Sequence, residues 1–292
     1  MNVKRMFPGG DPFLMKYDGK YYIYCTTENN DKFVSTESFH TDVDGKDGFF
    51  VYESEDMIKW ENKGLCLSSQ DVLGDKWFWA PEVSYYNGRF YMVYTANERL
   101  SIAVSDSPFG PFRQYSDGWL RDGMSIDGHL LFDESGIYLY YVAAGIFVAK
   151  MSNDLKRIEH EFPGHLILAE EPWETVDCHI AEGPCVIKHN GLYYLSYSCN
   201  HTRSKDYAVG YAVSVAPAGP FKKYEHNPIL HRTADMAGVG HNSYMPAEKE
   251  NKYICAYHCH NSDPDNFKPR MVCLCDAEFI LENGVEVLKM YY

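Results

Sequence analysis

Hydrophobic and polar residues alternate over short stretches of the chain, and one arrangement recurs five times. In each copy an apolar stretch leads into a turn, and a second stretch rich in tyrosine and other strand-forming residues follows. Asn-Gly between two such stretches is the strongest local signal of a β-hairpin, because a type I′ turn needs positive φ at both central residues. The five predicted hairpins are YDGKYYIYCTT (17–27), YNGRFYMVYTA (86–96), ESGIYLYYVAA (134–144), HNGLYYLSYSC (189–199) and KENKYICAYHC (249–259).

A second β unit follows each predicted hairpin. Two pairs of these units resemble each other: SDSPFGPFRQY (105–115) with SVAPAGPFKKY (214–224), and SEDMIKWE (54–61) with SNDLKRIE (152–159). The Asp- and Ser-rich stretch from Thr36 to Gly48 is expected to form a long loop of the first unit. About four strands per unit, five units and almost no helical periodicity predict an all-β, five-bladed β-propeller. We expect a single domain over residues 1–292, with a β-sandwich as the main alternative.

Composition supports strands and excludes two classes of partner. Aromatic residues make up 15% of the chain, which suits strands better than helices. The formal net charge of −14 argues against a nucleic-acid partner, since phosphate binding draws on clustered Lys and Arg. No apolar run approaches the ~18 residues of a membrane helix, so no membrane partner is expected. The start of the chain lacks the apolar segment of a signal peptide, and we expect a cytoplasmic protein.

Nine cysteines raise the question of a metal site or disulfides. A cluster near the end of the chain combines thiols with imidazoles: Cys255, His258, Cys259, His260, Cys273 and Cys275. The spacings include no C-x2-C pair, and the residues fall within strand-like alternation. Reduced thiols packed in the core are therefore expected rather than zinc ligands.

A propeller would bring distant acidic residues to one place. The first strand of each blade lies nearest the axis, so all five first strands begin around one central depression. Counted back from each turn, the residues at these starts are Asp11, Glu82, Asp127, Glu182 and His241. Clustered carboxylates repel one another and concentrate at functional sites, which predicts a functional pocket here. Glu82 has the alternative role of binding backbone amides of the next blade.

Five motifs in order carry a resemblance to a known family: GGDPFLMKYDGKYYIY, WAPEVSYYNGRFYMVY, SIDGHLLFDESGIYLYYV, AEGPCVIKHNGLYYLSYS and GVGHNSY. As a set they resemble glycoside hydrolase family 43, five-bladed propellers that act on arabinose- and xylose-containing saccharides. The resemblance covers nearly the whole chain. It implies that Asp11 is the general base, that Glu182 is the general acid, and that Asp127 orients the acid and tunes its pKa.

The chemistry of these carboxylates agrees with that assignment. Hydrolysis of a glycosidic bond needs one acid to protonate the leaving oxygen and one base to activate water. Inverting enzymes hold the two carboxyl groups ~6.5–9.5 Å apart, and retaining enzymes ~5–5.5 Å. Acids on the first and fourth of five blades would lie across the pocket, which favours inversion. A third carboxylate nearby would raise the pKa of the acid, as catalysis near neutral pH requires.

Four further residues are predicted to contact the substrate. The resemblance implies that Trp79 packs against the sugar, that His241 lies at the pocket floor, and that Arg270 contacts hydroxyl groups. His129 follows Asp127 by two residues, so it shares a strand face with it and is expected to line the pocket. His241 has two alternative roles, as a buried structural histidine or as a ligand of a central ion or its waters. Some relatives hold calcium in the channel, although two carboxylates need no cofactor for this chemistry.

The predicted function is an inverting exo-glycosidase. It would remove terminal α-L-arabinofuranosyl or β-D-xylosyl units from oligosaccharides derived from plant cell walls. The alternatives are an endo-arabinanase, a retaining fructan hydrolase, a glycoside phosphorylase, or a sugar-binding propeller without activity. A phosphorylase would carry a basic cluster beside the pocket, and the sequence shows none.

Overall fold

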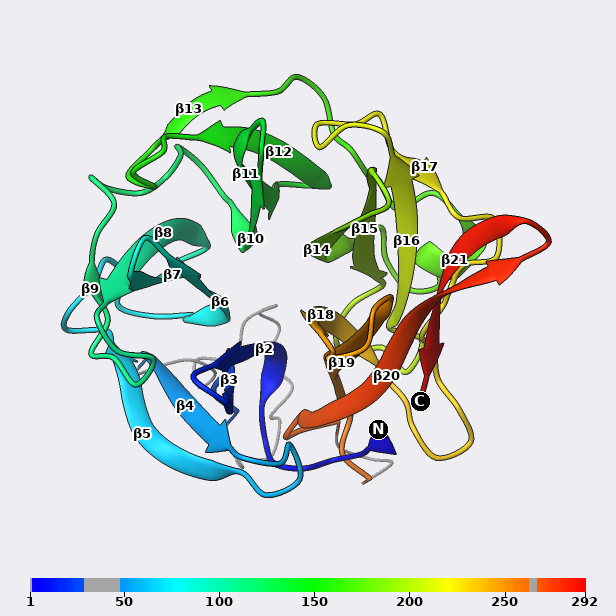
Figure 1. The fold of residues 1–292 in the computed structure, drawn as a ribbon, viewed down its shortest axis with the longest axis horizontal. Helices are drawn as coiled ribbons and strands as arrows, with labels where there is room; N and C mark the ends of the chain where they lie inside the picture. Colours follow the sequence, from blue (N-terminus) through cyan, green and yellow to red (C-terminus); the bar gives the residue numbers. More distant parts are fainter. Residues whose placement is uncertain (1, 29–47, 263–266) are drawn as a thin grey trace.

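The protein is a ring of five antiparallel β-sheets. The computed structural model describes residues 2–28, 48–262 and 267–292. Figure 1 shows the sheets standing around a common axis like the blades of a propeller. Within the described ranges the regular helical structure is the short 3₁₀ turn η1 (Pro172–Glu174), and no helix is long and apolar enough to cross a bilayer. The predicted five-bladed, all-β propeller is confirmed, and the β-sandwich alternative is wrong.

The strands of each blade follow one another from the axis outward. Blade 1 consists of β2 (Gly10–Tyr17), β3 (Lys20–Thr26), β4 (Gly48–Ser54) and β5 (Glu61–Ser68). Blade 2 consists of β6 (Trp79–Tyr86), β7 (Arg89–Ala96), β8 (Arg99–Ser105) and β9 (Arg113–Gln114). Blade 3 consists of β10 (Ile126–Asp133), β11 (Gly136–Val142), β12 (Ile146–Met151) and β13 (Ile158–Glu161). Blade 4 consists of β14 (Ala181–His189), β15 (Leu192–Cys199), β16 (Ala208–Ser214) and β17 (Lys222–Lys223).

Both ends of the chain complete blade 5. Its inner strands are β18 (Gly240–Pro246), β19 (Lys252–Cys259) and β20 (Met271–Glu282). The N-terminal strand β1 (Asn2–Val3) and the C-terminal strand β21 (Val285–Tyr291) both pair with β20, along different parts of its length. Because the chain continues from β1 into blade 1, the pairing of β1 with β20 closes the ring, which the hairpin pattern did not predict (Figure 1).

The turns between the two inner strands of the blades agree with the sequence signal. Asp18 and Gly19 have φ of 48° and 77°, Asn87 and Gly88 have 47° and 83°, and Asn190 and Gly191 have 47° and 77°. Positive φ at both central residues is the mark of a type I′ turn, which Asn, Asp and Gly adopt at low cost. The expected loop of the first blade ends where β4 begins, and its residues 36–47 lie outside the described residues.

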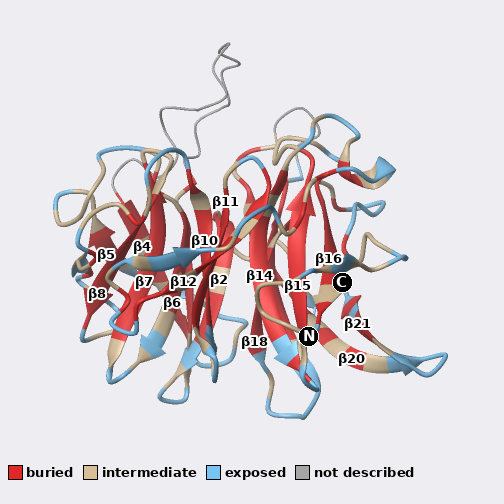
Figure 2. Ribbon diagram, turned by 90° about the horizontal axis from the view of Figure 1, so that it is seen from above, coloured by how far each residue is buried: buried red, intermediate tan, exposed pale blue. Residues whose placement is uncertain are grey.

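Hydrophobic clusters fill the spaces between neighbouring blades. Between blades 1 and 2, for example, Met15 and Tyr24 pack with Phe90 and Tyr94. Comparable clusters join each further pair of blades, including blade 5 with blade 1. Figure 2 shows the result, with buried strands through the body of the ring and exposed turns at its faces. The inner ends of the blades are thereby fixed relative to one another.

The cysteines of the last blade belong to this packing. Cys255, Cys259, Cys273 and Cys275 are buried in the cluster between blades 4 and 5, with free thiols. Across residues 2–28, 48–262 and 267–292, no group of three or more His, Cys, Asp or Glu is arranged to hold a metal ion. The expected packing of these thiols is confirmed.

Every innermost strand begins with a β-bulge. The pairing register shifts at the start of β2, β6, β10, β14 and β18. One residue in each bulge has a φ between 44° and 58°, and these residues are Asp11, Ala80, Asp127, Gly183 and His241. A bulge bends the strand and re-aims a side chain, often next to an active site. Glu182 precedes its bulge residue by one position and Glu82 follows its own by two, so the predicted equivalence of these acids with Asp11 is wrong.

Candidate active site

A cavity of about 430 Å³ lies at the end of the ring where the innermost strands begin. Asp11, Asp127 and Glu182 line it from blades 1, 3 and 4. The other predicted residues that line it are Trp79, His241 and Arg270. The structure therefore brings most of the predicted residues to a single cavity, and His129 and Glu82 are the two that do not line it.

Asp11 is held by a dense set of donors. Its Oδ1 accepts a hydrogen bond from Arg270 Nη1 at 2.7 Å, and its Oδ2 accepts one from the Thr26 hydroxyl at 2.7 Å. Burial alone would raise the pKa of this carboxyl group, and the positive charge of Arg270 is the largest of the effects that lower it. The pKa of Asp11 is held well below its usual value, so Asp11 is ionised and available to take a proton.

Arg270 is itself anchored by a second carboxylate. Its Nε donates to Glu28 Oε1 at 2.7 Å and its backbone amide donates to Glu28 Oε2 at 3.1 Å. Glu28 also lies 3.4 Å from Lys268 Nζ. Arg270 thus bridges two buried carboxylates, which fixes its charge beside Asp11 on the cavity wall.

His258 supports the backbone of Asp11. The amide of Asp11 donates to His258 Nδ1 at 3.1 Å, and the imidazole is fully buried. Burial and the Arg270 charge lower the pKa of His258 to about 4, which keeps the ring neutral and its Nδ1 able to accept. His258 therefore has a structural role at the active site itself.

Two glycines admit the side chains that hold the carboxylates. A Cβ on Gly10 would lie 2.0 Å from Arg270 Nη2, and a Cβ on Gly240 would lie 2.3 Å from a ring carbon of Tyr207. Each glycine immediately precedes a bulge residue, at equivalent positions in blades 1 and 5. The second glycine of the GGDPF motif is thus explained by the close approach of Arg270 to the backbone.

Gly10→Ala is expected to weaken both the fold and the base. The added methyl group displaces the Arg270 guanidinium, which costs about 1–3 kcal/mol of unfolding free energy. Loss of the ion pair raises the pKa of Asp11, so the acidic limb of the kcat/KM profile moves to higher pH. Gly118→Ala, where a Cβ meets open space, is the matched control for denaturant unfolding and for the pH profile. An unchanged acidic limb in Gly10→Ala would contradict this role of Arg270.

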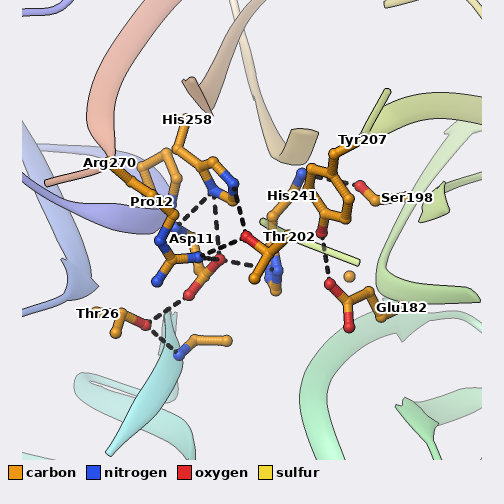
Figure 3. Close-up of polar contacts among 12 residues, drawn as sticks. Asp11, Pro12, Thr26, Glu182, Ser198, Thr202, Tyr207, His241, His258 and Arg270 are labelled. Carbon is orange, nitrogen blue, oxygen red and sulfur yellow. Dashed lines mark hydrogen bonds and ion pairs between the residues drawn. The ribbon is translucent and has the colours of Figure 1, made fainter. Parts of the chain in front are cut away.

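Glu182 has the opposite electrostatic environment from Asp11. Its Oε1 accepts a hydrogen bond from the buried Tyr207 hydroxyl at 2.7 Å. Burial raises its pKa to about 7, the Tyr207 hydrogen bond opposes that rise, and the Asp11 charge adds to it. Glu182 is therefore protonated below neutral pH and able to donate a proton. Figure 3 shows Glu182 with Tyr207 on one side of His241, and Asp11 with Arg270 on the other.

Asp127 lies in the same cavity and is coupled to Glu182. Its Oδ2 accepts a hydrogen bond from the backbone amide of Gly183, the residue after Glu182, at 3.0 Å. Burial, Glu182 and Asp11 together raise the pKa of Asp127 well above its usual value, while the Gly183 amide opposes the rise. Asp127 and Glu182 therefore titrate as a pair, and below neutral pH they hold at least one proton between them.

Activity is expected to fall as pH rises through about 7, where Glu182 loses its proton. Tyr207→Phe removes a hydrogen bond that favours the ionised form, so the alkaline limb of the kcat/KM profile should move to higher pH. The maximal kcat should stay within about threefold of the wild-type value, because the proton is retained on Glu182. Initial rates between pH 5 and pH 9 measure the shift. A limb that moves to lower pH would contradict the assignment of Glu182 as the acid.

His241 occupies the space between the carboxylates. Its Nδ1 lies 3.2 Å from Asp11 Oδ1 and 3.9 Å from Asp127 Oδ2. The ring packs on Gly183, where a Cβ would lie 3.1 Å from the ring carbon Cγ. Burial lowers its pKa, so the ring stays neutral at the centre of the cavity.

His129 and Glu82 form a structural pair below the cavity. His129 Nδ1 lies 2.7 Å from Glu82 Oε2, and His129 Nε2 accepts a hydrogen bond from the Val186 amide at 3.0 Å. The other Glu82 oxygen accepts from the amide of Leu130 at 2.9 Å. The prediction that His129 lines the pocket is wrong, because both ring nitrogens are engaged between blades. The alternative role of Glu82, binding a backbone amide of the next blade, is confirmed.

Several residues of the cavity wall were not predicted. Trp79, which was predicted, lies on the cavity wall, and its indole stacks on that of Trp77 with ring centroids 6.0 Å apart. The unpredicted lining residues are Glu98, Met124, Ile126, Ile180, His201, Thr202, Arg203, Phe267 and Lys268. Three cations, Arg203, Lys268 and Arg270, lie on the wall beside its carboxylates, which the sequence spacing did not show.

The donors near His241 bear on the predicted calcium ion. A small space of about 20 Å³ lies below the cavity, lined by Glu82, Asn242 and His241 among others. The buried Oδ1 of Asn242 faces no hydrogen-bond partner, but Glu82 is committed to His129 and Leu130. In the described parts of the chain no three His, Cys, Asp or Glu side chains are grouped to hold a metal ion, and a calcium ion held through waters stays a prediction.

Comparison with known proteins agrees with the fold and the cavity. The model of the family described as "Glycosyl hydrolases family 43" matches residues 7–280. The chain is 30% identical over 271 residues to a β-xylosidase of Xylanibacter ruminicola, covering 76% of this chain and 81% of that protein. It is 27% identical over 252 residues to a xylosidase/arabinosidase of Bacteroides ovatus, covering 72% and 75%.

A solved structure is similar over the whole chain. The crystal structure of an endo-1,4-β-xylanase from Bacteroides thetaiotaomicron superimposes with a TM-score of 0.84 at 34% sequence identity, covering 100% of this chain and 97% of that one. The family match spans all five blades and the motifs that supply the carboxylates of the cavity. The chain therefore belongs to glycosyl hydrolases family 43 and is a glycoside hydrolase.

Proposed function

We propose that the chain is an inverting exo-glycosidase that releases terminal β-D-xylosyl or α-L-arabinofuranosyl units from oligosaccharides of plant cell walls. The observation that carries this proposal is the opposite protonation of two carboxyl groups in one cavity. Asp11 has a pKa held well below its usual value, and Glu182 has a pKa raised to about 7. Two carboxyl groups with divergent pKa values supply the base and the acid of glycoside hydrolysis.

In the proposed reaction Asp11 takes a proton from a water molecule. The water oxygen attacks the anomeric carbon as the bond from that carbon to the leaving oxygen breaks, and Glu182 transfers its proton to the leaving oxygen. Asp127 and the Tyr207 hydroxyl hold the acid in place. Asp11 on blade 1 and Glu182 on blade 4 approach the cavity from different sides of His241 (Figure 3), which supports attack by water rather than by a carboxylate.

The choice of sugar rests on the relatives. The named activities of the two similar proteins are those of a β-xylosidase and a xylosidase/arabinosidase. The first name specifies xylose, and the second specifies xylose and arabinose. Trp79 on the cavity wall supplies an aromatic face against which a pentose ring can pack.

An endo-acting xylanase is the second candidate. The observation that favours it is the whole-chain similarity to a structure named as an endo-1,4-β-xylanase. From the first minutes of reaction, exo action on xylo- and arabino-oligosaccharides should give monosaccharide and, in equal amount, the oligosaccharide shortened by one unit. Endo action should release mixed shorter oligosaccharides, and chromatography of early products separates the two.

A panel of nitrophenyl glycosides tests the proposed function. We expect hydrolysis of the β-D-xylopyranoside or the α-L-arabinofuranoside and little hydrolysis of galactosides. Proton NMR of the first product should show the inverted anomer. A retained anomer would overturn the proposed mechanism, and a rate that depends on added phosphate would favour a phosphorylase acting through Arg203 and Lys268. No release from any substrate would favour a sugar-binding protein.

A further inference from the structure

Four of the five bulges make the same kind of hydrogen bond to the preceding blade, and the bulge of blade 4 is the exception. In four blades the amide of the bulge residue donates to a side chain on the second strand of the preceding blade. The four bonds are Ala80 N to Thr26 Oγ1 (2.8 Å), Asp127 N to Thr95 Oγ1 (3.1 Å), His241 N to Ser198 Oγ (2.8 Å) and Asp11 N to His258 Nδ1 (3.1 Å). The acceptors occupy equivalent positions, because each pairs with the residue before the bulge of its own blade.

The exception lies between blades 3 and 4. The equivalent position in blade 3 is Val142, which pairs with Ile126, the residue before that blade's bulge. Valine offers no acceptor. The amide of Gly183, the bulge residue of blade 4, donates instead to Asp127 Oδ2 at 3.0 Å. The ring therefore departs from its fivefold pattern between the two strands that carry Asp127 and Glu182.

A buried amide has a single hydrogen and is rarely left unpaired. A hydroxyl at position 142 would compete with the Asp127 carboxylate for the Gly183 amide, as hydroxyls bind the corresponding amides in blades 2, 3 and 5. With valine there, the carboxylate is the acceptor within reach. Val142 is buried and packs among the apolar residues between blades 3 and 4, so water does not replace the missing hydroxyl.

We propose that Val142 is a positioning residue, which directs the Gly183 amide to Asp127 and so fixes Asp127 beside the general acid. This inference rests on the proposed glycosidase function. The amide favours the ionised form of Asp127. When Asp127 is ionised, the proton shared by the pair resides on Glu182, where the leaving oxygen needs it.

Val142→Thr tests the inference with little change in volume. The new hydroxyl should capture the Gly183 amide, and the shared proton should then spend more time on Asp127. We expect kcat to fall about tenfold with KM within about twofold, since one hydrogen bond to a charged group is lost. The kcat/KM profile should also move to higher pH.

Val142→Ser and Val142→Ala separate the hydroxyl from the packing. Both shorten the side chain, but only serine adds an acceptor, so serine should reproduce the threonine effect and alanine should keep the wild-type profile. An equal loss of kcat with the same profile in both variants would overturn the proposal. These smaller side chains also remain informative if Val142→Thr fails to fold.

A measurement on the Gly183 amide does not depend on activity. Glu182-Gly183 is the one Glu-Gly pair in the sequence, so carbonyl-¹³C glutamate with ¹⁵N-glycine isolates this single amide by NMR. Its shift should follow the titration of Asp127 in the wild type and lose that dependence in Val142→Thr. A wild-type pH dependence in Val142→Thr would overturn the inference, even in a chain that hydrolyses no substrate. Failure of the proposed function alone would leave this result unchanged.

Discussion

Glu182→Gln is expected to lower kcat by about 10³-fold on natural oligosaccharides, because the leaving oxygen then departs without a proton. Glutamine keeps the size of the side chain, and its oxygen can still accept from the Tyr207 hydroxyl. The loss should depend on the leaving group. A nitrophenolate leaves with little protonation, so Glu182→Gln should lose far less activity on nitrophenyl glycosides than on xylo- or arabino-oligosaccharides.

The same variant should be more stable than the wild type at alkaline pH. The folded protein raises the pKa of Glu182 to about 7 from an ordinary value of 4.5, so the stability that the protonated form contributes is lost as pH rises through 7. Glutamine does not ionise and avoids that loss. Thermal unfolding at pH 8 measures the difference and shows at once that the fold is intact. Near wild-type kcat on oligosaccharides would contradict the role of Glu182.

Local sequence signals were enough to predict the ring. A hairpin is specified by a few adjacent residues, and pairs such as Asn87-Gly88 and Asn190-Gly191 adopt the expected turns. Repetition then supplied the architecture, since one hairpin cannot bury its faces alone and five similar units can. Ring closure through β1 was not predictable in this way, because a two-residue strand leaves no periodic pattern.

The sequence predicted which blades contribute to the candidate site, but it did not predict every residue that lines the cavity. Counting back from the turns placed Asp11, Asp127 and Glu182 at the correct end of their strands. It also placed Glu82 there, because a count that treats every strand as regular cannot detect a β-bulge. The bulge shifts side chains between faces, and Glu82 consequently binds His129 and Leu130 instead of lining the cavity.

The residues that set the protonation of the site left no local signal. Tyr207 follows Glu182 by 25 positions, and Arg270 lies 242 positions from Glu28 and 259 from Asp11. Such contacts exist only once the blades are assembled. The glycines of the GGDPF motif were the one available sign, since glycine beside a catalytic residue often marks the close approach of another group to the backbone.

Asp11→Asn is expected to lower kcat by about 10³-fold whatever the leaving group, because every substrate needs the base to activate water. The variant should still fold. The asparagine oxygen can face Arg270, and its amide nitrogen can donate to Thr26 Oγ1, which has lone pairs for this bond and for the Ala80 amide. Stability should fall, because Arg270 keeps only Glu28 as a carboxylate partner.

Comparison of the two variants identifies the base and the acid separately. Activity of Asp11→Asn on nitrophenyl glycosides should be as low, relative to wild type, as its activity on oligosaccharides, whereas Glu182→Gln should recover on the activated substrate. The acidic limb of the pH profile should also disappear in Asp11→Asn, because no base remains to be protonated. Recovery of Asp11→Asn on the nitrophenyl substrate would show that Asp11 acts at leaving-group departure. The base would then have to be another carboxylate of the cavity, with Asp127 the first to be tested.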